Sequence, residues 1–524
     1  MRRDEPAAMP SLGHLGLNLR SFNKEGYTPS LGGAKDPIST QIGYDKRERL
    51  LCIRCGEISN RSCSSVTRPG ESCQGDTMKQ PKEAPPELAW KKREKKFTTD
   101  GGHRSCLPEG LLQSYLHPIG CSGIIEELER AHRDPCGLVN VYVARLRSDL
   151  GGSSRRGWKG LRASFVGKGM TEAQARASAL GEAVERYSAI FRGDEFRIKA
   201  SYRELSSKAI HPNACMKFSA SQYREREEWN KRETEFNWVP QPFDEERETE
   251  WTPVWSLTEG RVKYVATASC YFGYPFSAVH DFCRPDSNGN AAGANLEEAI
   301  LKGFFEVVER DAVALWWYNR ARRPRVELAN FGEPYFQALG ELYRILGRRM
   351  HVLDISADFP IPVFAAVSNG GKGEGDLLLG FGAHLDPRVA IARALTEMNQ
   401  FLAETIAGET PCFFVGGPLE DAFLDPNPPS VVKTRADYAG FDNEDLRGDL
   451  RTCVELASER GLETLVLDQT RSVAGMHAVK VMVPEMRRWW ARFAPGRLYN
   501  VPVEMGWQVV PLTEEKLNPC HLAV

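Results

Sequence analysis

The sequence predicts a mixed α/β fold of the α+β type, and two observations lead to that prediction. Short runs of β-branched and aromatic residues alternate with longer stretches of helical period from residue 111 onward. Three of the helical stretches carry a polar face opposite an apolar face, and each follows a segment that contains glycine. A strand, a glycine turn and a helix in that order are typical of a phosphate site, so we expect several such units around one site.

The longest of these helices, expected over residues 295–317, organises the chain. It follows the glycine-rich segment 287–293. At about 100° per residue, its charged side chains fall within roughly one quarter of the circle. They are Glu298, Lys302, Glu306 and Glu309. Glu298 also stands three residues after Asn295, as in a capping box, so the alternative is an amphipathic helix with a solvated charged face.

The second helix is expected over residues 171–191, after the glycines at 167 and 169. Thr171 and Gln174 have capping-box spacing, which marks its start. Its polar face carries Ser178, Glu182 and Glu185, and Arg186 follows directly.

The third helix follows Gly380 and Gly382 and is expected to run to about residue 406. Asp386 is the expected N-cap, and Pro387 fits the first turn. Its polar face carries Arg393, Glu397 and Gln400.

Other periodic segments complete the prediction. Helices are expected over residues 123–128, 225–235, 336–346 and 445–460. Strands are expected over residues 138–144, 161–166, 262–266, 270–272, 351–355, 363–367, 377–382, 462–468 and 479–483.

The motif Glu-x-x-Glu-Arg occurs at residues 182–186 and 306–310, on polar faces that concentrate carboxylates. Solvated helix faces usually alternate the sign of their charges instead. Neighbouring carboxylates repel one another unless a cation lies between them, and Mg²⁺ prefers carboxylate and phosphate oxygens. Glycine segments at helix starts can offer backbone N–H groups to phosphate. The pattern therefore points to a site for Mg²⁺ and phosphate.

The order and spacing of these motifs resemble the nucleotide-binding motifs of the YcaO family. The similarity extends over residues 116–519, about three quarters of the chain. The combination of the three helical motifs is specific to the family, although each motif alone is a weak signal. The matching positions are Ser178-x-x-x-Glu182-x-x-Glu185-Arg186, Asn288-Gly289 with Gly293 and Glu298, Glu306-x-x-Glu309-Arg310-Asp311, and Arg393 with Glu397-x-x-Gln400.

The resemblance implies ATP and Mg²⁺ as cofactors. Lys168 is interpreted either as a phosphate partner or as a solvated lysine ahead of the second helix. The metal is assigned to Glu182, Glu185, Glu306 and Glu309. Nucleotide contacts, or the orientation of those contacts, are assigned to Ser178, Arg186, Glu298, Arg310, Arg393, Glu397 and Gln400.

The resemblance also implies a reaction on a ribosomal peptide. In the best-known branch, a Cys, Ser or Thr side chain attacks the preceding carbonyl, the oxyanion takes the γ-phosphoryl group of ATP, and loss of phosphate leaves a thiazoline or oxazoline. Because the substrate supplies the nucleophile, we assign no catalytic residue to the chain. The leading hypothesis is a SagD-like cyclodehydratase of azole- or azoline-modified peptide and bacteriocin biosynthesis. The alternatives are a thioamide-forming or other amide-activating member, and a non-catalytic ATP-binding scaffold.

The C-terminal tail departs from the SagD-like pattern. That branch commonly ends in a proline-rich tail whose terminal carboxylate reaches the active site. Here the last residues are Cys520-His521-Leu522-Ala523-Val524, without repeated prolines. Azoline formation is therefore less firmly implied than ATP binding.

Composition and family analogy together define the expected partners. A formal net charge of −2 gives no field for nucleic acid, and no apolar run approaches the ~20 residues of a membrane span. The thirteen scattered cysteines fit free thiols in a reducing cytoplasm. The resemblance implies a precursor peptide as substrate, a separate leader-binding partner protein and a homodimer.

Residues 1–105 are expected to be a disordered or mis-started extension, and residues 106–524 a YcaO domain. Glycine, serine, proline and charge dominate the extension, without a sustained period. Cys52, Cys55, Cys63 and Cys73 have a spacing similar to that of zinc ligands, but the second pair is not a tight Cys-x-x-Cys.

A start at Met78 is the simplest account of this composition. Mass spectrometry of the native protein should then find no peptides from residues 1–77, and their detection would refute that start.

Overall fold

The computed structural model describes residues 95–116, 122–131, 136–147, 164–232, 237–275, 281–370, 376–406, 413–416, 419–427, 431–441 and 443–522. The chain divides into two units, Met1–Met78 and Lys79–Val524, and every described residue belongs to the second. The predicted start at Met78 and the four cysteines between positions 52 and 73 therefore lie outside the described residues.

Strands and helices alternate along the described chain, which confirms the predicted mixed fold. The first sheet is antiparallel, with the order β3-β4-β5, and α1 and α2 lie next to it. Its elements are α1 (Pro108–Leu116), β3 (Ile125–Arg130), β4 (Asn140–Leu146), β5 (Ser164–Gly169) and α2 (Glu172–Ser188).

The second sheet has the order β13-β12-β11-β10-β15, and only its β10–β15 pair is parallel. Helix α8 packs on β11, and α9 packs on β13 and β12. The elements are β10 (Arg325–Val326), α8 (Pro334–Ile345), β11 (Arg349–Asp354), β12 (Val363–Asn369), β13 (Leu377–Ala383), α9 (Pro387–Ile406) and β15 (Val432–Lys433).

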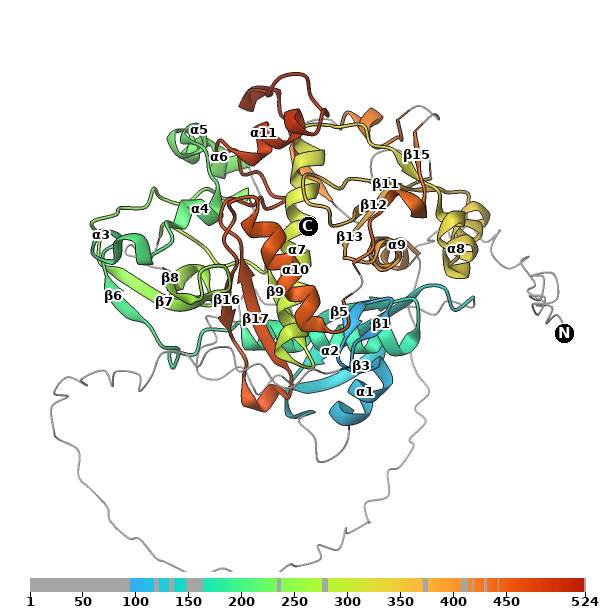
Figure 1. The fold of residues 1–524 in the computed structure, drawn as a ribbon, viewed down its shortest axis with the longest axis horizontal. Coiled ribbons are helices and arrows are strands. Elements are labelled where there is room, and N and C mark those ends of the chain that lie inside the picture. The colour runs from blue at the N-terminus through green and yellow to red at the C-terminus, as the bar shows by residue number, and fades with distance from the viewer. Residues whose placement is uncertain are drawn as a thin grey trace, which may run out of the picture. The chain divides into compact units, whose positions relative to one another are not determined.

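The third sheet is antiparallel, with the order β6-β7-β16-β17-β9, and β8 pairs with β7. Helix α7 packs on β17 and β9 and also contacts β13, so it lies between two sheets (Figure 1). The elements are β6 (Ile198–Ala200), β7 (Thr249–Ser256), β8 (Arg261–Ala266), β9 (Asn290–Gly293), α7 (Leu296–Tyr318), β16 (Leu465–Asp468) and β17 (His477–Met482).

Shorter elements complete the described fold. Strands β1 (Phe97–Thr99) and β2 (Gly102–Arg104) form a hairpin, and β14 (Phe414–Gly416) pairs with β18 (Cys520–Leu522). No helix within the described ranges is long and apolar enough to cross a membrane. The remaining helices are α3 (Tyr202–Leu205), α4 (Pro212–Met216), α5 (Ala220–Arg224), α6 (Arg226–Arg232), α10 (Leu446–Ser458) and α11 (Arg497–Glu504).

The glycines ahead of the second and third predicted helices lie within strands rather than in turns. The strand predicted over residues 377–382, which contains Gly380 and Gly382, is confirmed, and only the turns expected at these glycines are wrong. Gly167 is in β5, where an added Cβ would lie 2.0 Å from the backbone N of Ala179 on α2. Gly380 is in β13, where a Cβ would lie 2.4 Å from the backbone N of Met398 on α9. Glycine is needed at both positions because the helix crosses the strand at backbone contact distance. By contrast, Gly289 does lie in a turn, with a φ of 77°.

Two other local predictions are wrong. Residues 123–128 lie in the 3₁₀ turn Ser122–Ile124 and in strand β3, because pairing with β4 overrides the helical preference of the Glu and Leu residues. Residues 270–272 follow the 3₁₀ turn Thr267–Ser269 and contain a bridge from Phe272 to Ile190 rather than a strand. The other expected helices and strands are present, with ends shifted by several residues.

The boundary predicted at residue 105 falls inside the folded chain. The hairpin of β1 and β2 precedes it, and Arg104 in β2 donates to Glu298 on α7 at 2.9 Å. The last residues of the predicted extension therefore belong to the folded unit.

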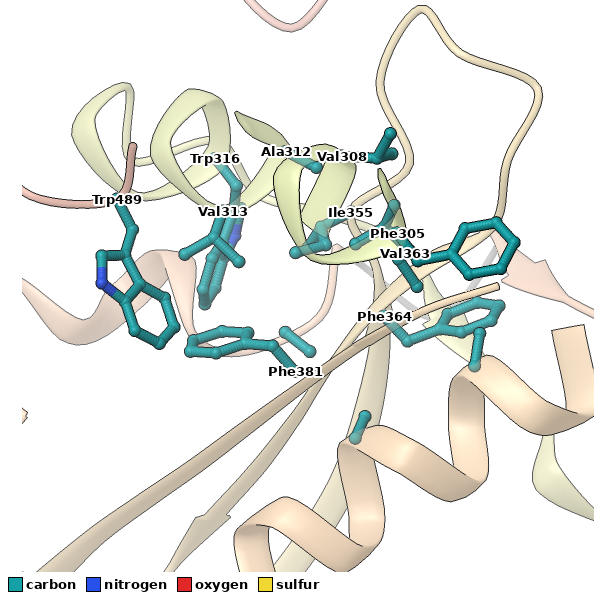
Figure 2. Close-up of a cluster of buried hydrophobic side chains, with 14 of the residues drawn as sticks. Phe305, Val308, Ala312, Val313, Trp316, Ile355, Val363, Phe364, Phe381 and Trp489 are labelled. Carbon is teal, nitrogen blue, oxygen red and sulfur yellow. The ribbon is translucent and has the colours of Figure 1, made fainter. Parts of the chain in front are cut away.

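Helix α7 lies in the core, so the alternative of a solvated amphipathic helix is wrong. Trp316 is fully buried, and the predicted cap is present because Asn295 accepts from the backbone N of Glu298. Figure 2 shows Val313 and Trp316 of this helix close to Phe381 of β13. A buried helix presents its few charged side chains only where other protein groups or a ligand can satisfy them.

Gly380→Ala should destabilise the protein by about 1–3 kcal/mol, because the new methyl group would overlap the α9 backbone. Gly181→Ala in α2 is the matched control, since a Cβ there meets nothing within 4 Å. The control should be neutral or stabilising by up to about 1 kcal/mol. Urea denaturation measures the free energy of unfolding of both variants. A Gly380→Ala protein as stable as wild type would contradict the close packing of α9 on β13.

Candidate functional site

A stripe of charged side chains interrupts the buried surface of α7. Lys302, Glu306 and Arg310 are half-buried and lie about one turn apart, while most of their neighbours are buried. Glu298 and Glu309 are also buried. The predicted polar face therefore exists, but protein groups surround much of it.

Arg310 joins the two glutamates of the α7 motif. Its Nη2 donates to Glu306 Oε1 at 3.1 Å, and its Nη1 lies 3.0 Å from Glu309 Oε1. Arg393 of α9 comes within 4.0 Å of Glu309 Oε2, a buried oxygen that accepts no hydrogen bond from the described residues. Burial raises the pKa of Glu309 to about 7 against the opposing charge of Arg310, and the negative charge of Glu397 adds to the increase.

The α2 motif has the same arrangement. Arg186 lies 2.9 Å from Glu182 Oε1 and 3.6 Å from Glu185 Oε1. Burial raises the pKa of Glu185 well above its usual range, and the charge of Glu182 raises it further. Arg186 opposes the shift, whereas Glu306 on α7 adds to it. The carboxylates of α2 and α7 therefore repel one another across the gap between the helices.

Glu397 connects α9 with the first sheet. Lys168 Nζ in β5 donates to Glu397 Oε1 at 2.8 Å, and the backbone N of Phe381 donates to Oε2 at 2.5 Å. Burial alone would raise the pKa of Glu397, but the charges of Lys168 and Arg310 outweigh it and the pKa is lowered. Lys168 is therefore an ion-pair partner in this structure rather than a solvated lysine.

Glu298 is held by a segment that sequence reasoning missed. Arg104 Nη1 donates to Oε1 at 2.9 Å, and both the backbone N and the Oγ of Ser105 donate to Oε2 at 3.1 Å. Lys302 adds an ion pair at 2.8 Å. The segment 104–105 carries no motif and lies far away in sequence, so its contact with α7 had no sequence signal.

The other two predicted residues occupy the same helix faces. Ser178 lies one turn before Glu182 on α2, and Gln400 lies one turn after Glu397 on α9. Both side chains are half-buried. All the residues predicted for the site thus lie on the polar faces of α2, α7 and α9 or on the adjacent strand β5.

Lys480 in β17 is a further charged residue that the sequence did not single out. It is buried, and its Nζ donates to Asp286 O at 2.7 Å, Asn288 O at 3.1 Å and Asn290 Oδ1 at 3.2 Å. Burial lowers its pKa, although Asp286 opposes that shift. The bonds fix the turn that leads into β9 and α7. A lysine within an apolar strand was the available sequence signal.

The motif glutamates lie close together, and two of them are held in the buried part of the site. Among the described residues, no group of three or more His, Cys, Asp or Glu side chains is close enough to hold a metal ion, and the glutamates contact arginines instead. Burial is the main cause of the raised pKa values of Glu185 and Glu309, and neighbouring glutamates add to it. Glu309 Oε2 also accepts no hydrogen bond from the described residues. Because a divalent cation would stabilise the ionised form of such buried carboxylates, these residues fit Mg²⁺.

The family model described as a YcaO cyclodehydratase that binds ATP and Mg²⁺ matches residues 166–487, more than half of the chain. The chain belongs to the YcaO family. The resemblance inferred from the motifs is therefore confirmed, and so are the predicted cofactors, ATP and Mg²⁺. The match contains all the residues predicted to bind them.

Solved structures show the same YcaO fold. A heterocyclase in complex with substrate and cofactor is 48% identical, with a TM-score of 0.74 over 79% of this chain and 57% of that chain. The heterocyclase TruD is 52% identical, with a TM-score of 0.62 over 67% of this chain and 50% of that chain. The chain thus spans between 50% and 57% of the length of these two heterocyclases.

Two archaeal relatives match nearly their whole length. The YcaO protein from Methanopyrus kandleri, bound with AMPPCP and Mg²⁺, is 24% identical, with a TM-score of 0.57 over 76% of this chain and 97% of that chain. An uncharacterized protein from Methanothermobacter thermautotrophicus is 27% identical over 390 residues, which are 72% of this chain and 93% of the relative. The first supports the fold, and the second shows that the sequence similarity extends over most of both chains.

Glu309→Gln should change how stability depends on pH. The folded-state pKa of Glu309 is about 7 and its ordinary value is 4.5, so folding favours the protonated form and wild-type stability should fall as the pH rises through this interval. Because glutamine does not titrate, the variant should gain about 1–3 kcal/mol relative to wild type between about pH 5 and pH 8. Urea denaturation at both pH values measures the gain. Glu341→Gln on α8 is the exposed control, and an identical response of both variants would refute the prediction.

Proposed function

We propose that this chain is an ATP-dependent YcaO-type cyclodehydratase that converts Cys, Ser or Thr residues of a ribosomal peptide into thiazolines or oxazolines. The observation that carries the proposal is the convergence of carboxylate-rich faces from α2 and α7, where the charge of Glu306 on α7 contributes to the raised pKa of Glu185 on α2. The identities of 48% and 52% to two heterocyclases support the choice of reaction.

In this proposal the cation is held by Glu182, Glu185, Glu306 and Glu309. These carboxylates contact Arg186 and Arg310 in the ligand-free arrangement. With Mg²⁺ held by the carboxylates, the guanidinium groups of Arg186 and Arg310 would lie beside it and could donate to phosphate oxygens, for which their planar donors are suited. ATP supplies the phosphoryl group that turns the amide oxygen into a leaving group.

The remaining residues predicted for the site orient the metal-binding carboxylates and the helices that carry them, or contact the nucleotide. Arg393 on α9 comes within 4.0 Å of Glu309 on α7. The ion pair between Lys168 and Glu397 joins strand β5 to α9. Glu298 secures the start of α7 through Arg104. Ser178 and Gln400 extend the polar faces by one turn each and contact the nucleotide in this proposal.

The chemistry requires positioning and charge neutralisation more than a protein nucleophile, because the peptide brings its own hydroxyl or thiol. We therefore assign no catalytic base or nucleophile. The proposed partners are a precursor peptide, a separate leader-binding protein and a second copy of this chain, and the proposed compartment is the cytoplasm.

Glu306→Gln should weaken Mg·ATP binding at least about 10-fold, because one of four carboxylates that share the cation becomes neutral. Calorimetry on wild type and variant, each checked for native folding, measures the change. Glu341→Gln also removes one carboxylate, but from the solvent-facing side of α8, so its Mg·ATP affinity should equal that of wild type. A folded wild type that binds no Mg·ATP, even with a partner protein added, would overturn the proposal.

Mass spectrometry of a treated Cys-, Ser- or Thr-containing precursor peptide tests the reaction itself. The proposal expects loss of one water per ring and consumption of one ATP per ring. Exchange of an amide oxygen for sulfur would indicate a thioamide-forming enzyme instead. ATP binding without any peptide modification, in the presence of the leader-binding partner, would favour a scaffold.

A further inference from the structure

Trp489 lies directly against the arginine of the α7 motif. It belongs to the segment between β17 and α11, and only 7% of its surface is exposed. The guanidinium carbon of Arg310 is 3.4 Å from the centroid of the indole ring. Figure 2 shows the indole beside Val313 of α7, and its ring lies 5.7 Å from that of Phe381. This residue follows the last position of the family match by two residues.

The segment that carries Trp489 is fastened to α7 at two positions, one directly after Arg310 and one about two turns further along the helix. Asp311 Oδ1 accepts from the backbone N of Arg487 at 2.7 Å, and Tyr318 Oη donates to the backbone O of Trp489 at 2.9 Å. Asp311 also accepts from Arg497 Nε at 3.1 Å, which ties the start of α11 to the same carboxylate. The indole is therefore held at a fixed place relative to the α7 motif.

The guanidinium of Arg310 is bounded by carboxylates and by the indole. Glu306 takes a hydrogen bond from Nη2, but Nη1 is buried and makes no hydrogen bond to the described residues, although it lies 3.0 Å from Glu309 Oε1. A planar cation on an aromatic face is stabilised more as water is excluded, and only 14% of the Arg310 side chain is exposed. Arginine has four rotatable bonds, so a rigid surface on one side restricts where its charge can lie.

We propose that Trp489 is a positioning residue of the nucleotide site: its indole holds the Arg310 guanidinium where it neutralises Glu306 and Glu309 and where it meets the phosphates of Mg·ATP. Asp311 acts through the same segment, because it anchors the backbone at Arg487. The proposal rests on the proposed function of Arg310 as a nucleotide contact. It adds a residue beyond the helical motifs and explains why an aspartate follows Glu-x-x-Glu-Arg on α7.

Trp489→Leu should weaken Mg·ATP binding by about 10- to 30-fold, the range expected for loss of a desolvated cation–π contact. Trp489→Phe keeps an aromatic face and should bind within about 3-fold of wild type. If the leucine variant does not fold, Trp489→Met replaces it, because methionine fills the volume without an aromatic ring. Calorimetry with Mg·ATP, after thermal denaturation has confirmed folding, gives the affinities.

Trp507→Leu is the matched control. Trp507 stacks on Arg323 at 4.2 Å from the ring centroid, so this variant also removes an Arg–Trp stack, but one outside the carboxylate faces of α2 and α7. Its Mg·ATP affinity should equal that of wild type. Equal weakening in both variants would mean that loss of any indole stacked on an arginine loosens the protein, and it would overturn the inference.

A double-mutant cycle separates positioning from packing. Lysine at position 310 keeps the charge but lacks the planar group that lies flat on the indole. In the Arg310→Lys protein, adding Trp489→Leu should therefore weaken Mg·ATP binding by less than about 3-fold. The same change in the wild-type protein should weaken binding by about 10- to 30-fold. Equal costs in both backgrounds, or a Trp489→Leu protein that binds like wild type, would overturn the inference. A wild type that binds no Mg·ATP would instead refute the proposed function.

Discussion

The burial of charged side chains along α7 is the constraint on which the rest of the structure depends. An ionised group inside a protein costs free energy unless a partner of opposite charge and sufficient hydrogen bonds accompany it. Glu298 has Arg104, Ser105 and Lys302 as partners, whereas Glu309 pairs with Arg310 and has one oxygen that accepts no hydrogen bond from the described residues. The contacts of Glu298 are complete, and the proposed function assigns the incompletely bonded carboxylate of Glu309 to the cation.

Close packing of helices on strands brings the charged faces together. Glycines in β5 and β13 let the backbones of α2 and α9 lie directly on these strands. Helix α9 contacts both β13 and β5, so Lys168 in β5 reaches Glu397 on α9. A side chain larger than hydrogen at Gly167 or Gly380 would push a helix outward and separate these charges.

Two segments from outside the helical motifs secure the ends of the charged stripe. The hairpin of β1 and β2 holds the start of α7 through Glu298, and the segment before α11 covers Arg310 with Trp489. Lys480 fixes the turn that precedes β9, and its charge also acts on Glu185. The site is therefore built from at least five regions of the chain, although three helices supply the residues proposed to bind nucleotide and metal.

The sequence by itself determined the three polar-faced helices, their N-caps at Thr171 and Asn295, and the residues gathered on one face of each, because helical period and capping depend on neighbours within a few positions. Only the tertiary structure decided that the glycines of β5 and β13 lie directly under helix backbones, that α7 is buried, that Arg104 and Trp489 meet α7, and that Lys480 bonds the turn ahead of β9. The contact between Arg104 and Glu298 joins residues 194 positions apart, and no local period encodes such a pairing. The raised pKa of Glu309 also depends on the tertiary structure, since it arises from burial and from charges on separate helices.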